Sequence, residues 1–102
     1  MIVLIAEDDG LILKTIEHQL VKGGHQVILT RNGKDAIDKI KEIDLDLVIT
    51  DIMMPFASGI EILSSIKELS KKIPVIMLSS MGQEEVVIEA FDLGASDFMV
   101  KP

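Results

Sequence analysis

The sequence predicts an α/β fold in which one five-stranded parallel sheet carries helices on both faces. Short apolar runs alternate with amphipathic stretches along the 102 residues, and regular alternation of strands and helices produces a parallel sheet with right-handed crossovers. Leu47, Val48 and Ile49 make one run apolar on both faces of the pleat, as a strand buried between two layers of helices requires. The 48% of hydrophobic residues suffice for a core and exclude a disordered chain.

Each expected strand is a short run rich in valine, isoleucine and leucine, which favour a pleated, buried backbone. The gap between successive runs is long enough for one crossover helix. The expected strands are 2–6 (IVLIA), 26–30 (QVILT), 46–50 (DLVIT), 74–78 (PVIML) and 96–100 (SDFMV).

Four amphipathic segments between these strands are expected to be helices, at 10–22, 33–42, 59–70 and 83–93. Residues suited to capping stand at their ends, namely Asp9, Asn32 and Ser58 as N-caps, and Gly23–Gly24 and Gly94 as C-terminal stops. Apolar stripes at helical spacing are expected to face the sheet, at Leu11, Ile12, Thr15, Ile16 and Gln19–Leu20 in the first helix and at Ile60, Leu63, Ile66 and Leu69 in the third.

The composition excludes several classes of protein. A net charge of −7 opposes direct binding to nucleic acid or to an anionic membrane, and three phenylalanines are too few for base-stacking platforms. Cysteine is absent, which excludes disulfide and thiolate chemistry. We find no signal peptide and no apolar run of the roughly 20 residues that a membrane helix needs. We therefore expect one soluble, cytoplasmic domain.

Acidic residues follow two of the expected strands, at the edge where open parallel sheets bind ligands. The first strand is followed by Glu7, Asp8 and Asp9, and the third by Asp51. Carboxylates that converge repel one another unless a cation lies among them. Because they are hard oxygen ligands without histidine or cysteine, they favour Mg²⁺, with Mn²⁺ as an alternative.

The remaining strand ends carry groups that suit a phosphoryl group. Ser79–Ser80 follow the fourth strand and Lys101 follows the fifth, so that hydroxyl donors and a point charge face the carboxylates. Phosphoryl transfer depends mainly on such positioning and charge neutralisation. Asp51 is therefore the expected nucleophile, since a carboxylate can form an aspartyl phosphate. The second strand ends in Thr30-Arg31-Asn32, which we interpret as turn and cap residues.

Four stretches together resemble the receiver domain of bacterial two-component response regulators: VLIAEDDG, LVITDIMMPFASG, PVIMLSSMG and AFDLGASDFMVKP. Their order and spacing make the resemblance specific, and it covers the domain from its first strand to its fifth. The resemblance implies a flavodoxin-like strand order of 2-1-3-4-5. It also implies a closing helix after the fifth strand, which this chain lacks. We therefore expect residues 1–102 to be a fragment of a longer response regulator.

The resemblance also implies the roles of the site residues. Asp51 is the expected phosphoacceptor, and Glu7, Asp8, Asp51 and the backbone carbonyl of Met53 are the expected magnesium ligands. The switching and turn residues that the resemblance implies are Ser79 as switch hydroxyl, Lys101 as the contact to the phosphoryl group and carboxylate, Phe98 as switch aromatic, and Pro55 and Gly59 as the turn that closes over the site.

By this resemblance the domain is a phosphorylation-dependent switch and does not act as an enzyme on an outside substrate. The expected phosphodonor is a sensor histidine kinase or a small molecule, as in a phosphorelay. Phosphorylation would change the face formed by helix 83–93 and strand 96–100, which controls an output domain or a downstream protein. If the chain is a fragment, we expect a bare face on the first and fifth strands and self-association into a homodimer through it.

Two other classes of protein fit less well. A phosphatase of the haloacid dehalogenase type needs a second aspartate two residues after the nucleophile, where this chain has Met53. A flavodoxin-like nucleotide or flavin carrier needs a phosphate-binding loop after the first strand. The AEDDG sequence at 6–10 would repel a phosphate there.

Overall fold

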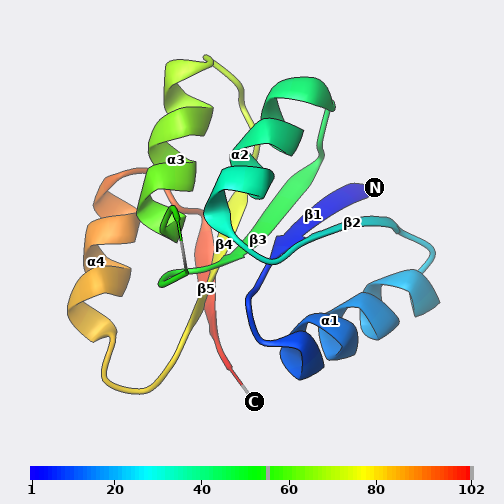
Figure 1. The fold of residues 1–102 in the computed structure, drawn as a ribbon. Coiled ribbons are helices and arrows are strands. Elements are labelled where there is room, and N and C mark those ends of the chain that lie inside the picture. The colour runs from blue at the N-terminus through cyan, green and yellow to red at the C-terminus, as the bar shows by residue number, and fades with distance from the viewer. Residues whose placement is uncertain (55, 102) are drawn as a thin grey trace.

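The computed structural model describes residues 1–54 and 56–101 as a parallel five-stranded sheet in the order β2-β1-β3-β4-β5. This confirms the predicted strand order. The strands are β1 (Ile2–Ala6), β2 (Gln26–Thr30), β3 (Leu47–Asp51), β4 (Val75–Ser79) and β5 (Asp97–Val100). The helices are α1 (Gly10–Lys22), α2 (Gly33–Glu42), α3 (Gly59–Glu68) and α4 (Glu84–Asp92). Figure 1 shows α1 on the opposite side of the sheet from α2, α3 and α4.

The first two strands and the first two helices have the predicted bounds, whereas each later strand begins one residue later than predicted. Asp46 lies outside β3, where its carboxylate accepts a 2.7 Å hydrogen bond from the Ile2 amide. Pro74 has no N–H to donate to the sheet. At the other end β3 continues through Asp51, which pairs with Leu78. Helix α3 ends two residues early because Ser70 turns the chain with a φ of 54°.

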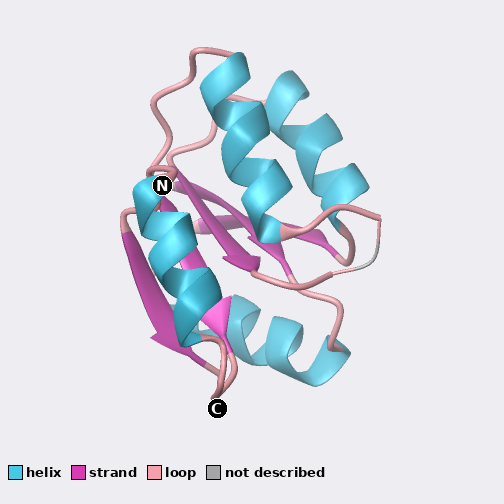
Figure 2. Cartoon of the chain, turned by 90° about the vertical axis from the view of Figure 1, so that its left-hand side faces the viewer, coloured by secondary structure: helices cyan, strands magenta, loops and turns pink. Residues whose placement is uncertain are grey.

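The core lies in two layers, one on each face of the sheet. Figure 2 shows the helices that cover the sheet. The larger layer packs α2, α3 and α4 against one face through residues such as Leu4, Ile40, Ile62 and Met77. The smaller layer packs α1 against the other face. Its buried members are Val3, Ile5, Leu13, Ile49 and Leu78. β1 and β3 are therefore covered on both sides, as the apolar runs predict.

The predicted apolar stripe of α1 is wrong in part. Leu13 is buried and packs with Ile16 and Leu20 against the sheet, whereas Leu11 is 78% exposed. The physical reason is packing: Leu13, Ile16 and Leu20 share one face of the helix and contact the sheet, and Leu11, two residues before Leu13, lies on the far side of the helix.

In α3 the predicted stripe is largely confirmed, because Leu63 and Ile66 are buried and Ile60 packs against the core. Only Leu69, which caps the helix, is exposed, and the stripe also includes the buried Ile62.

The expected bare face is also wrong for the first strand. β1 lies second in the sheet with α1 against it, and Val3 and Ile5 are fully buried. All four residues of β5 are exposed. Beside β5, an apolar hollow of about 400 Å³ lies between α1 and the strands; its lining includes Ile16, Leu20, Leu47, Ile49, Ile76 and Met99. The uncovered apolar surface therefore belongs to β3, β4 and β5.

No helix among the described residues has the length and apolar character that crossing a membrane would require.

Candidate functional site

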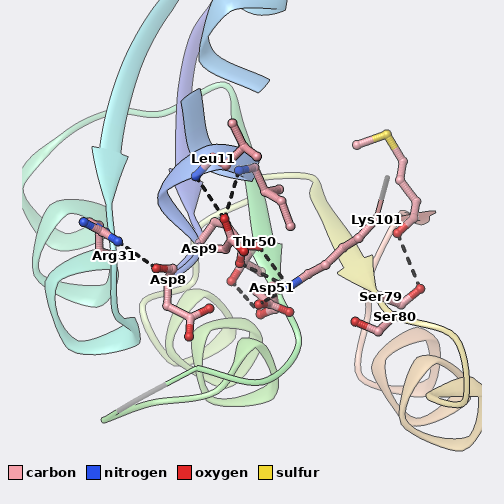
Figure 3. Close-up of polar contacts among 12 residues, drawn as sticks. Asp8, Asp9, Leu11, Arg31, Thr50, Asp51, Ser79, Ser80 and Lys101 are labelled. Atoms are coloured by element: carbon pink, nitrogen blue, oxygen red, sulfur yellow. Dashed lines mark hydrogen bonds and ion pairs between the residues drawn. The ribbon is translucent and has the colours of Figure 1, made fainter. Parts of the chain in front are cut away.

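Three carboxylates, those of Glu7, Asp8 and Asp51, meet at the carboxyl edge of the sheet, where β1 and β3 end. Figure 3 labels Asp8 and Asp51 of this group. Glu7 follows β1 and is fully buried, and Asp51 is the last residue of β3 and is 3% exposed. Asp8 is exposed in the loop between β1 and α1. One carboxylate oxygen from each residue lies within 4.8 Å of the other two. The sequence predicted this convergence, since parallel strands end at one edge.

Lys101, directly after β5, reaches into this group of acids. Its Nζ lies 2.6 Å from Oδ2 of Asp51, to which it donates a hydrogen bond. The same Nζ lies 2.9 Å from Oε1 of Glu7 and donates to Oε2 at 3.4 Å. One ammonium thus contacts two buried carboxylates, which leaves the cluster with excess negative charge.

The electrostatics of the cluster shift two titrations. Burial, followed by a hydrogen bond with Asp51, raises the pKa of Glu7 from 4.5 to about 7, although Lys101 opposes the shift. Burial by itself would lower the pKa of Lys101, but its hydrogen bonds to Asp51 and Glu7 outweigh that effect and raise it. Both pKa shifts have one origin, because the carboxylates of Glu7 and Asp51 share the Lys101 ammonium in a buried site.

The donor set fits a hard divalent cation. Oε1 of Glu7 is buried and lies 2.9 Å from the Lys101 ammonium, an ion pair whose geometry falls short of a hydrogen bond. Because Asp51 shares this ammonium, the Glu7 carboxylate keeps negative charge that a bound cation would neutralise. Together with the exposed Asp8 it provides oxygen ligands of the kind that Mg²⁺ prefers. Glu7, Asp8 and Asp51 are therefore the residues that could hold the metal.

The chain around these acids is held by local contacts. Asp9 caps α1, with its Oδ1 accepting from the amides of Leu11 at 2.9 Å and Ile12 at 3.2 Å. After β3 the chain turns back so that Gly59 lies against the Asp51 backbone. A Cβ at Gly59 would lie 2.6 Å from the Asp51 carbonyl oxygen, so only glycine fits. Pro55, the other residue of the predicted turn, lies outside the described residues.

Ser79 is the last residue of β4 and is 3% exposed, but it lies apart from the carboxylates. Its hydroxyl donates a long hydrogen bond of 3.4 Å to the Met99 carbonyl. Its own carbonyl accepts from the Lys101 amide at 2.8 Å. Ser79 is thus linked to the segment that carries Lys101 through the backbone, and the described contacts do not join its hydroxyl to Asp51.

Phe98 lies on the outer surface and not in the carboxylate cluster. Its side chain is 42% exposed and meets Phe91 of α4 edge to face, with ring centroids 6.0 Å apart. Both rings line a groove of about 340 Å³ between α4 and β5, whose wall also includes Ser79 and Val87. Met53, expected to act only through its carbonyl, has a side chain that is 59% exposed.

The sequence analysis missed one residue of this edge. Arg31, interpreted as part of a turn, donates from Nη2 to the Asp8 carbonyl at 2.9 Å. The signal that could have found it is strand order: β2 lies beside β1, so its end lies beside Asp8.

Comparison with known proteins gives a consistent result. The family model described as the response regulator receiver domain matches residues 3–102. The chain is 43% identical to the chemotaxis protein CheY of Bacillus subtilis over 101 residues, covering 98% of this chain and 84% of that protein. It is 38% identical over 104 residues to response regulator RR06 of Streptococcus pneumoniae, of which it spans only 46%.

Solved structures agree. The receiver domain of the Francisella response regulator 1452 superposes with a TM-score of 0.90 at 32% identity, over 99% of this chain and 84% of that one. The fold, the family match and the relatives lead to one conclusion, which is that the chain belongs to the response regulator receiver domain family.

Proposed function

We propose that this receiver domain is a switch controlled by phosphorylation of Asp51. The observation that carries the proposal is the contact of Asp51 with Lys101 at 2.6 Å inside a cluster of three carboxylates. An aspartate that is 3% exposed at the tip of a buried strand needs such partners. A function that uses its charge explains why the fold tolerates it.

In the proposed reaction, a carboxylate oxygen of Asp51 attacks the phosphorus of the donor. The new bond joins that oxygen to phosphorus. The bond from phosphorus to the donor's leaving atom breaks, and its electron pair departs with an imidazole from phosphohistidine or with acetate from acetyl phosphate. Lys101 stays protonated, because its pKa is raised, and its ammonium follows the charge that moves onto the phosphoryl oxygens.

A bound Mg²⁺ would be held by Glu7, Asp8, Asp51 and the Met53 carbonyl, and would supply charge neutralisation for the transferred group. Mn²⁺ would serve as a substitute. The negative charge that remains when one ammonium faces three carboxylates supports this assignment.

The proposed switch follows from the new charge on Asp51. An acyl phosphate adds negative charge and acceptor oxygens, which attract the hydroxyl of Ser79. That hydroxyl is held only by a 3.4 Å hydrogen bond to Met99, which is weak and easily exchanged. Movement of Ser79 opens space in the groove that Phe98 lines. The balance between conformations of the α4–β5 face then shifts.

The proposed partners are a sensor histidine kinase as phosphodonor and an output domain or downstream protein that reads the α4–β5 face. Like the proteins it resembles, the chain would work in the cytoplasm. Response regulator RR06, of which the chain spans 46%, contains the matched region within a longer protein, which supports the proposal that residues 1–102 are one domain of a longer response regulator. Self-association through the exposed β5 would give a homodimer.

The test is an intact mass after incubation with acetyl phosphate and Mg²⁺. We expect one phosphoryl adduct on the unmodified sequence and none on Asp51→Asn or in EDTA. Asp35→Asn serves as the matched control, since Asp35 belongs to the first turn of α2 and to none of the three carboxylates. An adduct that survives in Asp51→Asn would remove Asp51 as the acceptor.

A further inference from the structure

We propose that Arg31 is a positioning residue that holds Asp8 in place for metal binding, an inference that rests on the proposed function. Arg31 Nη2 donates a 2.9 Å hydrogen bond to the main-chain carbonyl of Asp8. Figure 3 shows Asp8 between Arg31 and Asp51. The guanidinium therefore holds the backbone of Asp8 from one side while its carboxylate belongs to the cluster on the other.

Asp8 is the carboxylate that most needs a support of this kind. Glu7 and Asp51 are buried at strand ends, whereas Asp8 is exposed in a loop. On one side of Asp8, the Glu7 amide is bound to the Thr30 carbonyl at 3.1 Å. On the other side, Asp9 caps α1. The peptide group of Asp8 is the link between these two fixed points, and the bond from Arg31 restrains it.

Arg31 can act as a support because its own backbone is held on both sides. Thr30 is buried and its hydroxyl donates to the Ile5 carbonyl at 3.0 Å. Asn32 caps α2 by accepting from the Asp35 amide at 2.8 Å. The guanidinium therefore extends from a fixed point at the end of β2, and its planar shape limits the directions in which it donates.

Gly10 provides the space that the guanidinium occupies. A Cβ at Gly10 would lie 3.3 Å from Nη2 of Arg31, close enough to push the end of that side chain aside. The backbone of Gly10 does not need glycine for its φ, since it lies in the first turn of α1. The approach of Arg31 therefore favours a residue without a side chain at position 10, since a Cβ there would shift the guanidinium by a few tenths of an ångström.

The direction in which Arg31→Ala changes the affinity for Mg²⁺ distinguishes a positioning role of Arg31 from an effect of its charge. A cation near an acidic site repels Mg²⁺, so removal of the Arg31 charge should by itself tighten metal binding. Loss of the support should weaken it, because metal affinity depends on groups that orient the ligands. If Arg31→Ala weakens binding, the loss can only come from geometry.

The experiment is a calorimetric titration of Mg²⁺ into the metal-free chain and its variants. We expect Arg31→Ala to weaken binding about fivefold, and Arg31→Lys, which keeps one donor and the charge, to recover part of that. Lys34→Ala is the matched control, because Lys34 is an exposed cation of the same end of α2 whose loss should leave binding unchanged or slightly tighter. Gly10→Ala should weaken binding in the unmodified chain and have no further effect beside Arg31→Ala.

A second readout needs no metal. The carbonyl carbon signal of Asp8 should shift in the NMR spectrum of Arg31→Ala, because that carbonyl loses its hydrogen bond, while the midpoint of urea unfolding stays the same. If Arg31→Ala binds Mg²⁺ as tightly as the unmodified chain or more tightly, the positioning role of Arg31 is overturned and the proposed function is not affected. Failure of the unmodified chain to bind Mg²⁺ would overturn the metal step of the proposed function, and the role of Arg31 with it.

Discussion

Lys101 Nζ and Asp51 Oδ2 lie 2.6 Å apart although fifty positions of sequence separate the two residues. The pair is mostly shielded from water, with Lys101 16% and Asp51 4% exposed at the side chain. Glu7 shares the same ammonium. Removal of either partner would leave a charge in a place where solvent cannot replace the lost contact.

Lys101→Ala should therefore destabilise the metal-free chain by about 2–3 kcal/mol at pH 8. The loss should be smaller at pH 5.5, since Glu7 then carries a proton and repels Asp51 less. Urea unfolding at the two pH values measures both effects. The control is Lys14→Ala, since Lys14 pairs with Glu17 at 3.3 Å but is 71% exposed, and such pairs contribute little. Equal losses in the two variants would contradict the assignment.

The stability of the metal-free chain should fall as pH rises from 4.5 to 7. The pKa of Glu7 is 4.5 in the unfolded reference and about 7 in the fold, so the folded state binds the extra proton in this window. The contribution of Glu7 to the free energy of unfolding is therefore greatest below pH 4.5. It declines as the pH rises to 7, by at most about 3 kcal/mol. Affinity for Mg²⁺ should rise over the same window.

Glu7→Gln is the variant for this test, with thermal unfolding and Mg²⁺ titration across the pH range. It should remove the dependence on pH that Glu7 causes and weaken metal binding at pH 8. A pH profile that is the same in both proteins would show that another group is responsible.

Gly59→Ala should destabilise the fold by about 2 kcal/mol, because its Cβ would lie 2.6 Å from the Asp51 carbonyl and the neighbour is backbone. The displaced Asp51 should also accept phosphoryl more slowly. Gly23→Ala is the comparison, since its Cβ would find its nearest neighbour at 3.4 Å. Chemical unfolding of the two variants decides the matter, and a Gly59→Ala protein as stable as the unmodified chain would refute the close approach.

Ser79→Ala should still be phosphorylated by acetyl phosphate, because the Ser79 hydroxyl does not contact Asp51. The amide signals of α4 and β5 should then fail to shift on phosphorylation. Ser79→Thr, which keeps the hydroxyl, should preserve those shifts. NMR spectra recorded beside an intact mass separate the two properties; full shifts in Ser79→Ala would remove Ser79 from the switch.

The chain should self-associate with rising concentration through β5 and its neighbouring hollow, since Met99 and the apolar lining are uncovered. Met99→Glu should lower the apparent mass in light scattering. Met81→Glu is the control, because Met81 is 91% exposed in the loop between β4 and α4, away from the hollow beside β5. A mass that does not change with concentration in the unmodified chain would count against the homodimer.

Much of this arrangement could be predicted from the sequence because it depends on local patterns. Apolar runs and alternation were enough for the sheet, and the parallel direction of β1 and β3 brings Glu7 and Asp51 to one edge. The buried face of α1 was predicted only in part, because Leu11 and Leu13 are equally apolar and only packing against the sheet shows that Leu13 is the buried one. Arg31 was missed because its partner is a main-chain carbonyl, which no side-chain pattern reveals; only the position of β2 beside β1 brings the two together.

The direction of the Ser79 hydroxyl also lay beyond sequence analysis. Both the Asp51 carboxylate and the Met99 carbonyl could accept a hydrogen bond from this hydroxyl. Only the positions of β4 and β5 show that it donates to Met99. The side chain of Phe98 is a similar case, because its partner Phe91 belongs to another element. Contacts between different helices and strands depend on how these elements are arranged in space, which the periodicity of the sequence does not reveal.

The contact between Glu7 and Lys101 joins two ends of the chain that are 94 positions apart. During synthesis Glu7 and Asp51 are added before Lys101, so a growing chain contains these two carboxylates without the ammonium that pairs with them. Asp51 would therefore gain its ammonium partner only once β5 has paired with β4. A shorter nascent chain would carry the acidic cluster without the base that the proposed phosphoryl transfer uses.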